Sequence, residues 1–237
     1  MNLYVYCLSN EVTDRMVEPA AGVAGAGAPR LIRYEGLAAV VSEYEADVVA
    51  VTRENVFAHE RVIGHVLAHT TPLPFRFGTV VTAARLASYV DSQREFLRTQ
   101  LARVRGCVEM SVKIIWDAEA VKPKKTAAAN ESGAAARGRG AAFMATKRRE
   151  ILGDEALRAE AEGVAAWLEG RLGDAVREAE VSVRPLEAMV LAAAHLVERA
   201  RLEEYKERVE RARLERAELH FLTSGPWPPY SFSNARS

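Results

Sequence analysis

The sequence predicts an α+β protein in which antiparallel sheets carry helices on one face. Three observations lead to this class. Apolar residues alternate with period two at 3–8 and again at 108–116, which is typical of strands. Between these segments, apolar residues recur with the 3.6-residue period of amphipathic helices. The chain has 237 residues, enough for two domains of ordinary size.

Residues 1–121 are expected to form an N-terminal α+β domain. A first strand is followed by a flexible glycine-rich loop at 20–29 and by a hairpin centred on Glu35-Gly36. One helix is expected from Thr52 to the prolines at 72 and 74, and a second to about Arg105, with Gly106 as its C-terminal cap. The order strand, hairpin, helix, short strand, helix, strand predicts a ferredoxin-like variant with one solvated sheet face.

A flexible basic linker or loop is expected at 122–140, because this stretch has no apolar stripe to offset the entropy of ordering. The C-terminal α+β domain then covers 141–237. Four glycines interrupt helical sequence at 143–180, which predicts two or three short helices. The segment 181–198 fits a hairpin broken at Pro185 or an alanine-rich helix. A surface helix at 199–219 and a strand at 218–225 follow.

The stretch TSGPWPPYSF at 223–232 holds three prolines and three aromatic residues, which excludes helix and central strand. An extended tail is expected. One interpretation is a clamp, in which Trp227, Tyr230 and Phe232 fold back over an apolar groove with their polar tips hydrogen-bonded. The other is a polyproline ligand, since Pro226 and Pro229 form a PxxP pattern.

Charge and hydropathy exclude several classes of partner. The 32 basic side chains balance the 32 acidic ones, so no net field draws the chain to nucleic acid or to an anionic membrane. No apolar run approaches the length of a membrane span and no signal-peptide pattern opens the chain, so a cytosolic protein is expected. Cys7 and Cys107 lack metal-binding spacing and are expected to be buried thiols.

Candidate chemical groups are few. His65 and His69 have i,i+4 spacing, but no HExxH motif occurs, so packed or solvated histidines are expected rather than a metal site. Neither a phosphate-binding loop nor a nucleophile elbow is found, so no catalytic residue and no cofactor are expected. Arg76 lies between two phenylalanines in PLPFRFGT. Pairing inside the fold is the favoured interpretation, and outward projection toward a partner is the alternative.

Four stretches, in the same order along nearly the whole chain, resemble the gas vesicle accessory proteins of the GvpL/GvpF type. These stretches are PLPFRFGTV, VRGCVEMSVKIIW, MVLAAAHLVER and GPWPPYSF, of which the last is the most specific. The chain departs from the family pattern at His195-Leu196-Val197, where a Tyr-Leu-Val run is common. It also departs at 141–150, where the family often has an aromatic–leucine pair.

The resemblance implies two α+β domains and favours the hairpin for 181–198. It also implies a non-enzymatic role in gas vesicle assembly, in the cytoplasm and on the vesicle. The implied partner is the hydrophobic shell protein GvpA, with other gas vesicle accessory proteins as further candidates. Nucleation, chaperoning and incorporation as a minor component stay open. The candidate family-motif or contact residues are Pro74, Arg76, Phe77, Gly78, Thr79, Gly225, Pro226, Trp227, Pro228, Pro229 and Tyr230.

Two alternatives from other classes are an RNA-binding module and a small-ligand enzyme on a ferredoxin-like scaffold. The polar face of 108–116 holds Glu109, Ser111 and Lys113 and is expected to be solvated. It carries no aromatic side chain on which a base could stack. No set of titratable residues converges in the sequence pattern. Neither nucleic acid nor a membrane is therefore an expected partner.

Overall fold

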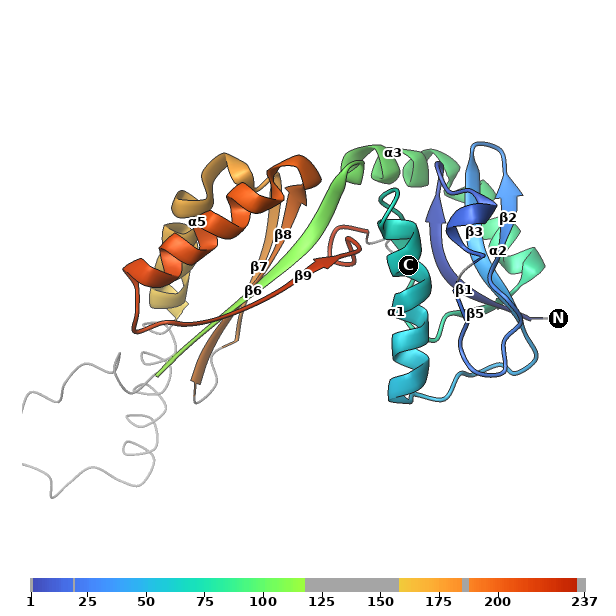
Figure 1. Ribbon diagram of the computed structural model, residues 1–237, viewed down its shortest axis with the longest axis horizontal. Coiled ribbons are helices and arrows are strands. Elements are labelled where there is room, and N and C mark those ends of the chain that lie inside the picture. Colours follow the sequence, from blue (N-terminus) through green and yellow to red (C-terminus); the bar gives the residue numbers. More distant parts are fainter. Residues whose placement is uncertain (1, 19, 118–157, 185–187, 234–237) are drawn as a thin grey trace, which may run out of the picture.

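The structure, a computed structural model, describes residues 2–18, 20–117, 158–184 and 188–233. Two antiparallel sheets lie at opposite ends of an elongated molecule (Figure 1). The first sheet has the strand order β2-β3-β1-β4, and β5 also pairs with β1. Its strands are β1 (Asn2–Ser9), β2 (Arg30–Tyr34), β3 (Leu37–Tyr44), β4 (Leu73–Pro74) and β5 (Val80–Thr82). Its helices are α1 (Arg53–Leu67), α2 (Ala83–Ser92) and α3 (Arg94–Val104), with a short 3-10 turn η1 (Asp14–Met16).

Helices cover both faces of the first sheet, so the prediction of helices on one face is wrong here. Leu3 and Val5 pack in one cluster with the buried side chains of α2 and α3. Tyr4 and Tyr6 pack in another cluster with those of α1. The physical reason lies in β1, which is apolar at both alternating positions and is buried from Leu3 onward.

The expected helix ending near Arg105 is two helices. Gln93 separates α2 from α3 with a backbone conformation outside the helical region (φ −109°, ψ 11°). Each helix buries its own apolar stripe, so the joined pattern looks continuous in the sequence. Gly106 follows α3 at φ 71°, as its expected capping position requires.

The second sheet has the order β7-β8-β6-β9. Its strands are β6 (Cys107–Asp117), β7 (Glu178–Arg184), β8 (Ala188–Glu198) and β9 (His220–Trp227). A helix at 158–172 and α5 (Leu202–Glu215) pack on one face of this sheet (Figure 1), and η3 (Gly173–Ala175) and η4 (Arg199–Arg201) are short 3-10 turns. The strands β7 and β8 are antiparallel partners, which confirms strands rather than a helix at 181–184 and 188–198. Residues 185–187 lie outside the described residues.

Two further predictions concern this part of the chain. The helix at 158–172 passes through Gly163 and Gly170 without interruption, so the expected breaks at these glycines are wrong. A Cβ at either position would meet no other atom within 4 Å, so these glycines mark open surface rather than a turn. The predicted linker at 122–140 and helical sequence at 143–157 lie outside the described residues.

The predicted order of strand, hairpin, helix, short strand and helix is found around the first sheet, but it is not a ferredoxin-like order, and the predicted last strand, β6, belongs to the second sheet. In that motif a helix follows the first strand, in the order β-α-β-β-α-β. Here β1 leads into the β2–β3 hairpin instead. The order β6, helix 158–172, β7, β8, α5, β9 is found around the second sheet.

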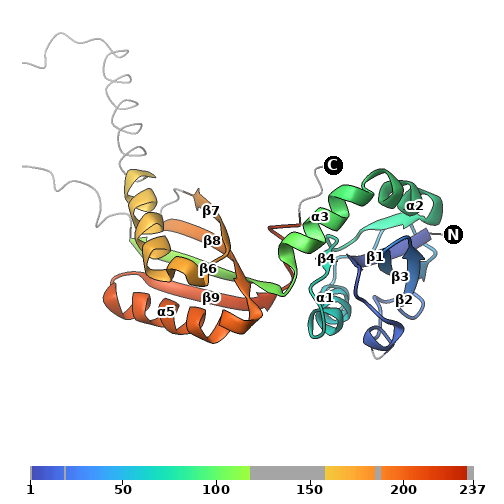
Figure 2. The ribbon, with the colours of Figure 1, turned by 90° about the horizontal axis from the view of Figure 1, so that it is seen from above.

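A continuous apolar cluster joins the two sheets. Leu97 and Leu101 of α3 pack in it together with Cys107 of β6, Leu196 of β8 and Phe232 of the tail. Figure 2 shows α3 and the C-terminal tail between the two sheets. None of the helices in the described ranges combines the length and apolar character that a membrane span requires.

Candidate functional site

The two sequence motifs singled out above, at 74–79 and 225–232, meet in space beside α1. The hydroxyl of Tyr230 donates a hydrogen bond to Glu60 Oε1 (2.8 Å) and lies 3.3 Å from Nε2 of His59. The ring of Phe77 packs edge-on against the His59 ring, with 5.8 Å between centroids. We call this region, formed by 74–79, the tail at 228–233 and the α1 residues His59 and Glu60, the junction site.

His59 is the centre of the junction site. Its Nδ1 lies 2.8 Å from the hydroxyl of Tyr4 on β1, and the backbone N–H of Gly78 donates to the same hydroxyl (3.2 Å). Burial lowers the pKa of His59 to about 4, so the imidazole is neutral near pH 7. The ring therefore holds strand, loop and tail together as a hydrogen-bonding partner. His65 is half-buried and His69 is exposed, and no metal-binding group of His, Cys, Asp or Glu is found among the described residues.

Glu109 fixes the tail from the side of the second sheet. Its two carboxylate oxygens accept hydrogen bonds from Ser231, at 2.7 Å from the backbone N–H and 2.9 Å from the hydroxyl. Burial raises the pKa of Glu109, and the bonds from Ser231 oppose that rise only in part. The alternation of β6 placed Glu109 on a solvated face, but the tail covers it. No sequence signal pairs 109 with 231.

The tail matches the clamp interpretation at its end and not at Trp227. Phe232 is 2% exposed in the apolar cluster between the sheets, and Pro228 and Pro229 are buried. Trp227 is 43% exposed, and its Nε1 donates to Ser224 Oγ (3.2 Å), so its expected role as a packed anchor is wrong. The reason is that β9 extends to Trp227, along the exposed edge of the sheet.

Gly225 is placed where the strand presses on β6. Its φ of 120° is unfavourable for any other residue, and an added Cβ would lie 2.8 Å from the backbone oxygen of Glu109. Its peptide bond to Pro226 is cis. The glycine and proline of this motif therefore shape the end of β9.

Arg76 is exposed and forms no ion pair with any described residue, so the favoured expectation of pairing inside the fold is wrong. Its loop is nonetheless well fixed. The carbonyl oxygen of Arg76 accepts from the backbone N–H of Thr79 (3.2 Å) and from its hydroxyl (2.7 Å). The Arg76 side chain lines a cleft beside the junction site.

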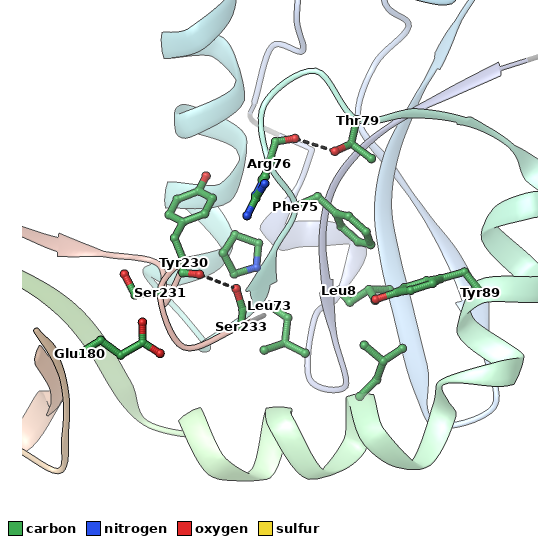
Figure 3. Close-up of a pocket in the computed structure, with 12 residues that line it drawn as sticks. Leu8, Leu73, Phe75, Arg76, Thr79, Tyr89, Glu180, Tyr230, Ser231 and Ser233 are labelled. Carbon is green, nitrogen blue, oxygen red and sulfur yellow. Dashed lines mark hydrogen bonds between the residues drawn. The ribbon is translucent and has the colours of Figure 1, made fainter. Parts of the chain in front are cut away.

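A cleft of about 640 Å³ opens beside the junction site (Figure 3). Figure 3 shows Glu180 and Ser231 at one end of the cleft and Tyr89 at the other. The rings of Phe75 and Tyr89 meet edge to face at 6.0 Å. The lining residues are Leu8, Leu73, Pro74, Phe75, Arg76, Thr79, Tyr89, Leu97, Glu180, Tyr230, Ser231 and Ser233.

The outer edge of β9 is a second candidate surface. β9 ends the order β7-β8-β6-β9, so no described strand pairs with its outer edge. Leu222 on this strand is 57% exposed. Two hollows lie beside the edge, of about 470 Å³ between α5 and β9 and about 390 Å³ around Leu214 and Leu219. Their walls include apolar side chains of both elements.

Comparison with known proteins identifies the family. A family model described as gas vesicle synthesis protein GvpL/GvpF matches residues 2–234. The chain belongs to this family. The GvpL/GvpF match covers both sheets, the junction site and the tail. The resemblance seen in the sequence is thereby confirmed, and with it a gas vesicle accessory protein of mixed α+β fold.

Relatives in the GvpL/GvpF family align over nearly the full chain. Gas vesicle protein F1 of Halobacterium salinarum is 26% identical over 237 residues, covering 98% of this chain and 92% of the relative. Gas vesicle protein L2 of the same organism is 27% identical, with coverages of 97% and 90%. Gas vesicle protein F of a Streptomyces species is 26% identical, with coverages of 98% and 99%.

Two crystal structures of GvpF share the fold. That of Anabaena sp. PCC7120 has a TM-score of 0.79 at 20% identity and covers 100% of this chain and 97% of its own. That of Microcystis aeruginosa has a TM-score of 0.80 at 19% identity, with coverages of 98% and 99%. The arrangement of helices and antiparallel sheets described above is therefore the GvpF arrangement.

Proposed function

We propose that this protein is a non-enzymatic accessory protein of gas vesicle assembly that binds the shell protein GvpA along the outer edge of β9. The observation that carries the proposal is an exposed and uncharged edge strand bordered by two hollows whose walls are in part apolar. Other members of the family are named gas vesicle proteins, which supports a partner in the vesicle. Family membership alone does not select this surface; the chemistry of the sheet edges does.

The remaining long edges are protected by charge. On β2, Arg30 pairs with Glu43 (3.2 Å) and Arg33 pairs with Asp14 (2.6 Å). On β7, Glu178 forms an ion pair with Arg103. Charged side chains are a common device that stops a sheet edge from pairing with another chain. The stretch Leu222–Ser224 of β9 has no charged side chain, so this edge lacks that protection.

The hollows beside β9 fit a strand that adds to the sheet. Side chains of an added strand alternate between the two faces, so every second one would point toward α5. There it would meet Tyr205, Val209 and Phe221 in one hollow, or Leu214 and Leu219 in the other. Backbone hydrogen bonds would give affinity, and the hollows, whose walls also hold Lys206, Glu210 and Arg213, would receive side chains of the added strand.

The role follows from the chemistry of a strand-rich, apolar shell subunit. Such a subunit must be kept from uncontrolled edge pairing before it reaches the growing wall. A chaperone would bind one strand edge of the shell subunit and then release it. A nucleator or a minor wall component would stay bound to that edge. We place this activity in the cytoplasm at the forming vesicle, with other gas vesicle accessory proteins as further partners.

We further propose that the chain consists of two α+β domains that divide near Gly106 rather than at 121, because β6 pairs with β8 and β9 of the second sheet. The segment 122–140 is then a linker or loop within the second domain. The separate cores on the α1 face of the first sheet and the helical face of the second support this division. The order of elements around the second sheet supports a ferredoxin-like arrangement there. Among the candidate contact residues, Trp227 at the end of β9 fits the shell-binding edge best.

An enzymatic or RNA-binding function has less support. Apart from Arg76, the polar groups in and around the junction site are engaged with one another, with His59 between two tyrosine hydroxyls and Glu109 bound to Ser231. On the uncovered face of the second sheet, Ser111 and Lys113 lie opposite Ala194 and Ala192. Small and aliphatic side chains do not provide the stacking platform that RNA-binding sheets use.

Co-purification with tagged GvpA tests the proposal. In an antiparallel edge strand, neighbouring residues alternate between bonding inward and pointing their N–H outward. Of the variants Leu222→Pro and Thr223→Pro, one therefore removes an outward N–H and leaves the pairing with β6 intact. We expect that variant to keep the wild-type melting temperature and to lose GvpA. Full retention of GvpA by a correctly folded variant of this kind would refute the proposal.

A further inference from the structure

The cleft beside the junction site combines an apolar wall with two charges that have no ion-pair partner among the described residues. Leu8, Leu73 and Leu97 lie in the wall, and Arg76 and Glu180 provide the charges. Its volume of about 640 Å³ falls in the range of sites that enclose a ligand, roughly 300–1,000 Å³. Figure 3 shows Arg76 and Glu180 on different parts of the cleft border.

The hydroxyl groups of Thr79, Ser231 and Ser233 in the cleft are engaged inside the fold. Thr79 Oγ1 donates to the carbonyl oxygen of Arg76, Ser233 Oγ donates to that of Tyr230, and Ser231 Oγ donates to Glu109. The charges of Arg76 and Glu180, together with the hydroxyl of Tyr89, are therefore the polar groups that a bound molecule would meet. A guanidinium presents paired N–H donors that match a carboxylate.

The Arg76 loop is held in place before any partner binds. Phe77 packs against His59, and Gly78 donates its N–H to Tyr4. Gly78 has a φ of 84°, which closes the turn at little cost for a glycine. A fixed loop loses little entropy on binding, so its exposed guanidinium is suited to recognition.

We propose that this cleft binds a segment of another polypeptide in which an apolar side chain lies between an acidic and a basic one. The acidic side chain pairs with Arg76, the apolar side chain packs against the half-buried rings of Phe75 and Tyr89, and the basic side chain faces Glu180. This contact is separate from the edge of β9 and does not depend on it. A protein with both surfaces holds two chain segments at once.

A phage-displayed library of random dodecapeptides, selected on the full chain, tests the proposal. We expect enriched sequences to share an acidic residue next to an apolar one. A synthetic peptide from this set should bind at least tenfold more weakly to Arg76→Gln, and its own acid-to-amide version should lose a similar factor on the wild type. Arg211→Gln is the matched control, because Arg211 is an exposed arginine of α5 without an ion pair among the described residues.

The result that would overturn the proposal is equal binding to Arg76→Gln and the wild type, or enriched peptides without an acidic residue, or no enrichment. Because Arg76 is exposed, Arg76→Gln should keep the wild-type melting temperature, which separates loss of binding from loss of fold. Of the two single variants Leu222→Pro and Thr223→Pro, the one that stays folded should bind these peptides as the wild type does. Failure of the shell-binding proposal is thereby distinguished from failure of this one.

Discussion

Two buried histidines connect stability to pH at the scale of single residues. Nδ1 of His59 is hydrogen-bonded to the hydroxyl of Tyr4, and Nδ1 of His195 lies 2.8 Å from the hydroxyl of Tyr205. Burial lowers the pKa of each from 6.5 to about 4. The unfolded chain takes up a proton on each histidine as the pH falls through 6.5, whereas the folded protein does so only near pH 4. The stability contribution of each neutral histidine is therefore fully present above pH 6.5 and is lost as the pH falls toward 4.

We therefore expect the free energy of unfolding to fall between pH 6.5 and 4, by up to about 1.4 kcal/mol per pH unit and per histidine. Urea denaturation of the wild type and of the double variant His59→Gln/His195→Gln measures this slope. Buried Glu60 and Glu109 have raised pKa values and act in the opposite direction, but they are present in both proteins. Parallel stability curves for the two proteins would contradict the assignment.

Gly225 gives a second test at this scale. Gly225→Ala forces a side chain into φ 120° and against the backbone of Glu109, so we expect it to destabilise the protein by roughly 1–3 kcal/mol. Gly64→Ala is the control, because Gly64 lies inside α1 and a Cβ there meets nothing within 4 Å. The free energy of unfolding of the Gly64→Ala variant should rise by about 0.5–1 kcal/mol. Thermal denaturation gives both values, and equal effects would rule out the proposed packing at Gly225.

At the scale of single residues, the sequence identified residues that lie at the candidate site. It was less successful in predicting which other residues they contact. It singled out Arg76 and Tyr230, which the structure brings to one cleft. It favoured pairing inside the fold for Arg76, which has no ion pair among the described residues, and it predicted a solvated position for Glu109, which the tail covers. Both errors have one cause: the local pattern shows which face of a strand a residue occupies, and not which distant segment covers that face.

At the scale of elements, the tail behaves as a clamp between the two sheets. Tyr230 is bonded to α1, Ser231 to β6, and Phe232 fills the apolar cluster between the sheets. Phe232→Ala should destabilise the protein by roughly 3–5 kcal/mol, the usual cost of emptying a buried phenylalanine site. Phe57→Ala, at a 51% exposed position of α1, is the control and should change stability little. Chemical denaturation measures the stability of both variants. Similar small losses of stability in the two would contradict the role of the tail as a clamp.

Elements with one strong period were predictable. The strand at 108–116, the helix after Thr52 and the capping Gly106 lie where the pattern placed them. The break at Gln93 and the continuous helix through Gly163 were missed, because each depends on a single residue's backbone conformation. The strands of 181–198 were open in the local pattern, since alanine-rich sequence is compatible with a helix as well as with a central strand between β7 and β6.

At the scale of the whole molecule, chain order predicted the fold class but not how its parts are layered. Helices cover both faces of the first sheet and one face of the second. That difference leaves the second sheet with a free face and a free edge at β9 among the described strands. We infer that the first sheet and the tail form the rigid support, and that β9 is the surface left for the shell protein.

Photo-crosslinking in cells that make gas vesicles tests this claim most directly. A benzoylphenylalanine at position 222, on the edge of β9, is compared with one at position 30, on the charged edge of β2. We expect crosslinks to GvpA from position 222 and none above background from position 30. GvpA crosslinks of equal yield from both positions, or none from position 222, would contradict it.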